Sequence, residues 1–263
     1  MGVYIKARAL PPTYDPDAQA FFTASGLTGA TNLTAVNQLV LDLKAANIWT
    51  KMKAIYPFIG GTSALHKWNL KDPQDTNAAF RLVFNGGMTH SSTGIAFGGV
   101  NGYANTFLAP STNLILNSTH LSYYSRTNVN LTQVEIGCFD NTGAYTIIEA
   151  RTANVSYFLT NTSIIAGVAD TNSAAFYIGN RTGASVANGF RNNVKIFNSG
   201  ASSSFRPVNN IYIGAANNPS SVATLFTTKE CAFASIGEGL SDTEAANFYT
   251  AVQNFNTTLN RQV

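Results

Sequence analysis

The sequence predicts a mainly β protein: an antiparallel β-sandwich with an N-terminal helical segment and a C-terminal capping helix. Three observations predict it. From Ile55 onward, short β-branched or aromatic runs alternate closely with Gly, Asn and Asp turns, which is typical of antiparallel sandwiches. Residues 15–53 and the end of the chain show helical periodicity instead. The length of 263 residues suits one sandwich with additions.

The N-terminal region divides into two parts. Residues 1–14 contain Pro11 and Pro12 and no hydrophobic period, so they are predicted to form an extended arm. Residues 15–53 are predicted to form a helical assembly segment. Its first helix starts at Asp15, a good N-cap, followed by Pro16 in the first turn, and it ends at Gly26.

The second helix of this segment carries an apolar stripe at helical spacing: Leu33, Val36, Leu39, Val40 and Leu43. Such a stripe must be buried. We expect it to be an assembly surface that joins copies of the chain into a homo-oligomer and fixes them to a particle. The alternative is that the helix packs on its own sandwich.

Residues 54–263 are predicted to form the sandwich with its terminal helix. Ser241 and Glu244 form a capping box, and Asp242 adds a negative charge to the first turn. The helix has an apolar face made of Ala245, Phe248, Tyr249, Val252 and Phe255. We therefore expect it to be a lid that covers the margin of the sandwich.

Composition excludes several classes of function. Charged residues make up 11% of the chain and the net charge is +3, too small for a nucleic-acid or anionic-membrane footprint. No run of about twenty apolar residues predicts a membrane span, and no apolar stretch near the N-terminus predicts a secretory signal. Cys138 and Cys231 are isolated and are expected to be buried thiols.

Motifs for chemistry are missing as well. No Gly-x-Ser-x-Gly elbow and no phosphate-binding loop occurs. His66, His90 and His120 are far apart and lack the spacing of metal ligands. We expect no catalytic residue, no metal and no cofactor.

Three stretches, in their order along the chain, resemble the concanavalin A-like sandwich family in its laminin-G-like form. "AIYPFIGG" is similar to the family's first strand. "IAFGGVNGYANTFLAPSTNLILNSTHLSYYSRT" is similar to its Phe-x-Gly turn, Tyr strand and central aromatic strand. "ECAFASIGEGLSDTEAANFY" is similar to its last strand and the start of its helix. The resemblance covers roughly residues 54–258.

The resemblance also sets expectations for the site. Enzymes of this family carry a Glu-x-Asp-x-Glu pattern on one strand face, and no such pattern occurs here. Relatives that bind calcium often have acidic residues after the Phe-x-Gly turn, where this chain has Gly99, Val100, Asn101 and Gly102. The carboxylates of this region are therefore expected to be solvated or locally hydrogen-bonded: Glu135, Asp140, Glu149, Glu230 and Glu238.

The whole sequence, including "LVLDLKAANIWTKMKAIYPFIGGTSALHKWNLKDP", also resembles a recurrent type of tailed-bacteriophage virion protein, in which such a sandwich is joined to an N-terminal helical piece. This resemblance implies a non-enzymatic structural protein on the capsid, as a decoration or head fibre, or on the tail. It would be assembled in the host bacterial cytoplasm, displayed on the virion surface and bound to other virion proteins.

The alternative function is a carbohydrate-binding module that attaches the virion to surface glycans. Tyr124 and Arg126 share one face of the strand "HLSYYSRT" and are the candidate glycan contacts. The competing interpretation is that Tyr123 belongs to the core and Tyr124 covers a neighbouring strand.

Overall fold

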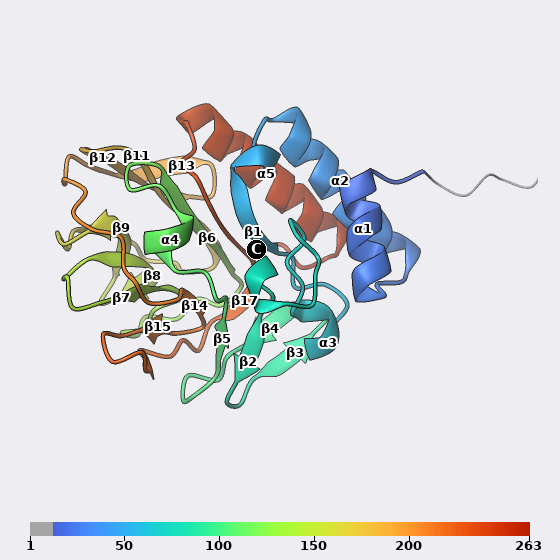
Figure 1. Ribbon diagram of the computed structural model, residues 1–263, viewed down its shortest axis with the longest axis horizontal. Coiled ribbons are helices and arrows are strands. Elements are labelled where there is room, and N and C mark those ends of the chain that lie inside the picture. Colours follow the sequence, from blue (N-terminus) through green and yellow to red (C-terminus); the bar gives the residue numbers. More distant parts are fainter. Residues whose placement is uncertain (1–12) are drawn as a thin grey trace, which may run out of the picture.

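The computed structural model describes residues 13–263, so the expected arm falls almost entirely outside the described residues. In this part of the chain two β-sheets face each other, and helices cover the outer face of one of them (Figure 1). The mainly β, antiparallel sandwich with N-terminal helices and a C-terminal capping helix is confirmed.

The sheet next to the helices, which we call sheet A, has eight strands within the described residues. In sheet order they are β13 (Val194–Ser199), β12 (Val186–Arg191), β11 (Ala175–Gly183), β6 (Thr119–Ser125), β17 (Glu230–Gly237), β4 (Gly94–Ala96) and β3 (Thr89–Ser91), with β1 (Met52–Tyr56) also paired to β17. Every pairing in sheet A is antiparallel. The sequence predicts most of these strands, but not β12 and β3, because "VANGFR" and "THS" have too few large apolar residues to be recognised.

The opposite sheet, sheet B, has nine strands within the described residues. Its main path is β10 (Gly167–Ala169), β9 (Val155–Thr162), β8 (Tyr145–Thr152), β7 (Ile136–Phe139), β14 (Tyr212–Ile213), β5 (Tyr103–Asn105) and β2 (Val83–Asn85). The short strands β15 (Ala216–Asn217) and β16 (Ala223–Thr224) form a hairpin, and β15 pairs with β7 in parallel. Leu225, directly after that hairpin, lines the site described below.

The helical elements are α1 (Pro16–Ser25), α2 (Ala30–Ala45), η1 (Trp49–Lys51), α3 (Ser63–His66), η2 (Asn77–Ala79), α4 (Pro110–Asn113) and α5 (Asp242–Thr258). Their ends follow the sequence signals. Asp15 accepts a hydrogen bond from the Asp17 N–H, and Gly26 ends α1 in the left-handed conformation. The capping box of Ser241 and Glu244 is present at α5. None of the described helices is long and apolar enough to cross a bilayer.

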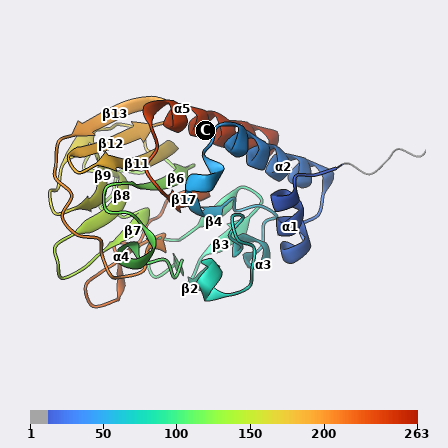
Figure 2. The same cartoon turned by 45° about the horizontal axis from the view of Figure 1, so that its top comes forward.

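Helix α5 lies on sheet A, and α2 lies beside α5 (Figures 1 and 2). Phe233 on β17 and Phe176 on β11 pack edge-to-face against Phe248 of α5. Val36, Leu39, Val40 and Leu43 of α2 are buried in the same apolar cluster, and Leu33 is partly buried at its edge. The predicted stripe is thus covered by the chain's own elements, which is the alternative left open by the sequence.

A second apolar cluster fills the space between the two sheets. It includes Tyr123 on β6, Ile136 on β7 and Phe158 on β9, all fully or almost fully buried. Cys138 and Cys231 belong to this cluster as free thiols, as expected, and burial raises the pKa of both. Sheet B therefore contributes one face to this core and turns its other face away from the helices.

Candidate functional site

The outer face of sheet B carries a groove with a volume of about 350 Å³. Alternation along the strands explains how it forms. On β8, Ile148 and Ala150 point into the core between the sheets, so Tyr145, Ile147 and Glu149 point outward. On β9, Phe158 points inward, so Tyr157 and Leu159 point outward. The remaining lining comes from Phe139, Thr152, Ile165 and Leu225.

Three aromatic rings make the groove surface. Phe139 and Tyr145 stack with their centroids 5.4 Å apart and their planes 26° apart, and Tyr157 lies on the neighbouring strand. All three side chains are only partly buried and pack on a small cluster that contains Ile147 and Leu159. Rings held in this way keep part of their faces open to solvent, as a flat ligand requires.

The close approach of β7 to β8 depends on Gly137. Its φ is +148°, and a Cβ there would lie 2.3 Å from the Thr146 carbonyl oxygen. Glycine alone tolerates both constraints. The position two residues later, Phe139, pairs directly with Tyr145 in the strand register, so Gly137 permits the aromatic pair.

Leu225 lines one side of the groove and belongs to residues 216–229, which we call the wall segment. The wall segment carries the β15–β16 hairpin and then Leu225, whose φ of +55° is unusual for a leucine. The Leu225 carbonyl oxygen accepts a hydrogen bond from the Val134 N–H at 2.9 Å. This bond ties the wall segment to the residues that lead into β7.

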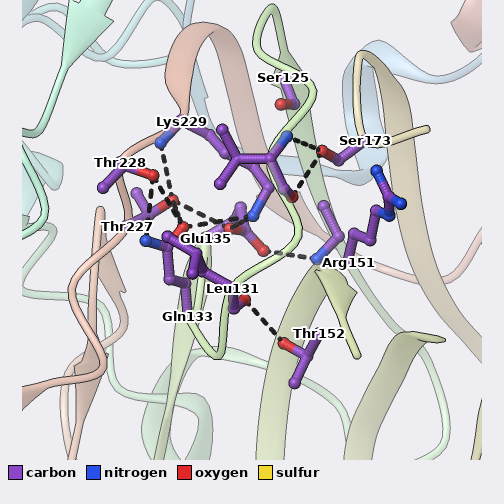
Figure 3. Close-up of polar contacts among 12 residues, drawn as sticks. Ser125, Leu131, Gln133, Glu135, Arg151, Thr152, Ser173, Thr227, Thr228 and Lys229 are labelled. Atoms are coloured by element: carbon purple, nitrogen blue, oxygen red, sulfur yellow. Dashed lines mark hydrogen bonds and ion pairs between the residues drawn. The ribbon is translucent and has the colours of Figure 1, made fainter. Parts of the chain in front are cut away.

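A buried ion pair holds the end of the wall segment (Figure 3). The Lys229 Nζ lies 2.9 Å from Glu135 Oε1, and both side chains are fully buried. Thr227 Oγ1 donates to the same carboxylate oxygen at 3.0 Å, and the Ala150 N–H donates to the other oxygen. The carboxylate is thus satisfied from both the wall segment and β8, as a buried charge must be.

Glu135 was expected to be solvated or locally hydrogen-bonded, and the structure corrects this. Its partner Lys229 lies 94 residues away in the sequence, which no local pattern reveals. Asp140, by contrast, is locally bonded as expected, because its Oδ1 accepts from the Thr142 N–H at 2.9 Å.

Glu149 is the carboxylate that lines the groove, and it pairs across the strands with Tyr157. Burial raises the pKa of this carboxyl above its ordinary value, and the negative charge of Glu135 raises it further. The Thr152 hydroxyl and the Lys229 ammonium act in the opposite direction. Within the described residues, no Lys or Arg lines the groove.

The residues singled out from the sequence lie elsewhere. Tyr124 on β6 is fully buried beneath α5, and its hydroxyl donates to Gln253 Oε1 at 2.8 Å. Arg126 is bound to Glu230 Oε2 at 2.7 Å and to the Arg261 carbonyl oxygen at 2.8 Å. A sugar cannot stack on Tyr124, because the terminal helix covers that face of sheet A. Tyr123 belongs to the core between the sheets, as the competing interpretation expected.

Two of the three histidines, His66 and His90, lie in contact although they are 24 residues apart in the sequence. The Nδ1 atoms of His66 and His90 lie 3.0 Å apart, and His66 Nε2 accepts from the Gly61 N–H. Burial, together with the charges of His90 and Arg261, lowers the pKa of His66 to about 3, so the pair is neutral at pH 7. In residues 13–263 no three His, Cys, Asp or Glu side chains are grouped so as to hold a metal ion.

Comparison with known proteins gives matches among solved structures and none in sequence. No protein-family model matches the chain, and no curated protein is significantly similar to it in sequence. Among solved structures, botulinum neurotoxin type C superposes with a TM-score of 0.57 at 10% identity, over 80% of this chain and 53% of the neurotoxin chain. The chain thus spans about half of the neurotoxin chain.

Two further structures superpose less well. Domain 4 of AbnA, a GH43 extracellular arabinanase from Geobacillus stearothermophilus in complex with arabinotriose, gives a TM-score of 0.46 at 11% identity, over 75% of this chain and 98% of that domain. A Trypanosoma rangeli sialidase gives 0.46 at 11% identity, over 82% of this chain and 38% of its own. The neurotoxin match supports a β-sandwich fold for the chain.

Proposed function

We propose that the chain is a carbohydrate-binding module whose ligand lies in the groove on the outer face of sheet B. The observation that carries the proposal is the lining itself: three partly buried aromatic rings, four aliphatic side chains, one carboxylate and one threonine around a cavity of about 350 Å³. Pyranose and furanose rings present apolar C–H faces and a rim of hydroxyls. Partly open aromatic rings match those faces, and oxygen acceptors match the hydroxyls.

The neurotoxin supports the proposal at the level of ligand class. Cell entry of botulinum neurotoxin type C depends on its interaction with two ganglioside molecules, which are glycolipids. A lectin-like sandwich that binds glycans is thus a precedent for this architecture. The groove residues of the present chain carry the argument, because fold alone does not define function.

The lining favours binding over hydrolysis. Cleavage of a glycosidic bond generally uses two carboxyl groups on opposite sides of the bond. Glu149 lines the groove, whereas Glu135 is bound to Lys229 and to two further hydrogen-bond donors, the Ala150 N–H and the Thr227 hydroxyl. The lining residues can stack on a sugar and bind its hydroxyls, and we propose no catalytic step.

The experiment is a glycan array probed with the purified chain, followed by calorimetry on the glycans that respond. We expect Tyr157→Ala to abolish the response, because it removes an aromatic face from the groove. Tyr249→Ala is the matched control: Tyr249 is also a partly buried tyrosine, but it lies on α5. Equal binding by wild type and Tyr157→Ala would contradict the proposal.

The setting of the module is a separate proposal that rests on the sequence resemblance. We propose that the module is displayed on a bacteriophage virion, where it contacts other virion proteins and holds surface glycans. Mass spectrometry of purified virions tests this setting. Detection of the chain among the virion proteins would support the proposal. If the chain were present in the infected cell and absent from purified virions, the proposed virion setting would be contradicted.

A further inference from the structure

The charges around the groove limit the kind of glycan it can take. Glu149 supplies a carboxylate at the lining, next to Tyr157 on the adjacent strand. No cationic side chain of the described residues lines the groove to balance it. A ligand that brought its own carboxylate would therefore meet a like charge at short range in a partly desolvated site, which is unfavourable.

Two cations that could balance this charge, Lys229 and Arg151, already have other partners. Lys229 is fully buried behind the groove and paired with Glu135 at 2.9 Å. Arg151, two residues after Glu149 on β8, directs its guanidinium to the Asn154 and Asn128 side-chain oxygens, at 2.6 Å and 2.8 Å. Figure 3 shows Lys229 and Glu135 held together inside the network of Thr227, Thr228 and Gln133. Neither cation can turn to an acidic ligand without breaking these contacts.

The apolar members of the lining support the same conclusion. Ile165 and Leu225, at the rim, are 61% and 36% exposed, so they can contact the ligand. Sulfate, phosphate or carboxylate groups would lose hydration against these side chains and gain no partner. Hydroxyl groups can donate hydrogen bonds to Glu149, and a carboxylate accepts two at once.

We infer that the groove selects neutral oligosaccharides and rejects sialylated, uronic-acid and sulfated ones, with Glu149 as the specificity-determining residue. This inference rests on the proposed carbohydrate-binding function. It separates the chain from lectins that bind the acidic group of a glycan, because such sites supply an arginine or lysine.

The test compares matched neutral and acidic glycans. Wild type, Glu149→Gln and Glu149→Ala are titrated with lactose against sialyllactose, and with galactan oligomers against galacturonan oligomers, at pH 7 and low salt. For wild type we expect the neutral member of a responding pair to bind at least about tenfold more tightly than the acidic member, since a like-charge contact is removed. Glu149→Gln keeps the neutral affinity within about fivefold, because an amide oxygen still accepts hydrogen bonds, and the discrimination falls to about twofold.

Each other outcome has a definite meaning. Preference of wild type for the acidic member would overturn the inference and leave carbohydrate binding intact. Unchanged discrimination in Glu149→Gln would also overturn it, because some other group would then set the selectivity. If wild type binds neither these glycans nor any member of a broad array, the proposed function fails and this inference fails with it. Circular dichroism of each variant verifies that it is folded.

Discussion

The two outer faces of the sandwich differ in whether helices cover them. On sheet A, the rings of Tyr124, Phe176 and Phe233 are fully buried under α5 and α2. On sheet B, the rings of Phe139, Tyr145 and Tyr157 lie only partly buried around a groove. Both faces carry aromatic residues in alternate strand positions, so the difference comes from what covers them. A covered face contributes stability, and an open face remains available for a ligand.

The two faces also differ in what holds them together. The helical layer on sheet A rests on a large apolar cluster shared by α1, α2, α5 and the sheet. The groove on sheet B has a small apolar cluster and relies on the polar network around Lys229 and Glu135 for its wall segment. The helical face should therefore respond mainly to changes in apolar volume, and the groove to changes in polar pairing.

The largest effect should come from breaking the buried pair. Lys229→Met leaves the Glu135 carboxylate buried without its cation, and we expect a loss of about 3–5 kcal/mol in the free energy of unfolding. Urea denaturation measures it. The double variant Lys229→Met with Glu135→Gln should recover much of the loss.

The control for this variant is Lys53→Met, because the Lys53–Glu238 pair is partly exposed, with 3.5 Å between charged atoms. It should change stability by no more than about 1 kcal/mol. Equal losses from Lys229→Met and Lys53→Met would mean that the buried network does not hold the wall segment.

The next effect concerns the helical face. Leu43→Ala on α2 removes a fully buried side chain from the cluster shared with α5, and we expect a loss of about 3 kcal/mol in the free energy of unfolding. Leu41→Ala is the matched control on the same helix, because Leu41 is 41% exposed. If Leu43→Ala were as mild as Leu41→Ala, α2 would not be an integral part of the fold, and the stripe would be free for a partner chain.

A smaller effect is expected at the start of the lid. Ser241→Ala removes the hydroxyl that accepts from the Glu244 N–H, which should destabilise the protein by about 1 kcal/mol. Thermal unfolding should show a lowered melting temperature with glycan affinity unchanged, because α5 covers the other sheet. Lost affinity in this variant would show that the two faces are coupled.

The smallest effect is the pH dependence of binding at the groove. Glu149 faces Tyr157 across the strands, with Glu135 and Lys229 behind it, and its pKa lies above the ordinary value of 4.5. Its ionised form accepts the sugar hydroxyls, so affinity falls as the pH drops through this raised pKa. We expect a loss of about fivefold, the difference between a charged and a neutral hydrogen bond. Calorimetry on Glu149→Gln should show no such loss.

The sequence predicts much of the fold because the relevant signals are local. Alternating aromatic and β-branched residues define most strands, and Asp15 with Pro16 and Ser241 with Glu244 mark the starts of two helices. The lid is also local, since five apolar residues of α5 recur at helical spacing. The strand β12 was missed because its burial comes from neighbouring strands and not from its own apolar residues.

The site could not be predicted in the same way. Its rings come from β7, β8 and β9, and its wall comes from Leu225, far along the chain. An aromatic residue in a strand has the same local pattern whether a helix covers it, as at Tyr124, or solvent reaches it, as at Tyr157. One signal was present: Tyr145, Ile147 and Glu149 alternate on one face of β8, and a carboxylate on an otherwise apolar face indicates exposure.

The most direct test of the account is a nuclear magnetic resonance titration of the isotope-labelled chain with a neutral oligosaccharide that responds on the array. The central claim is that the open face of sheet B, and not the helical face of sheet A, binds the ligand. The account predicts that amide and aromatic signals of Phe139, Tyr145, Glu149 and Tyr157 shift in a saturable manner, while those of α2 and α5 stay in place. Shifts centred on α2 and α5, with the β8 and β9 signals unchanged, would contradict it.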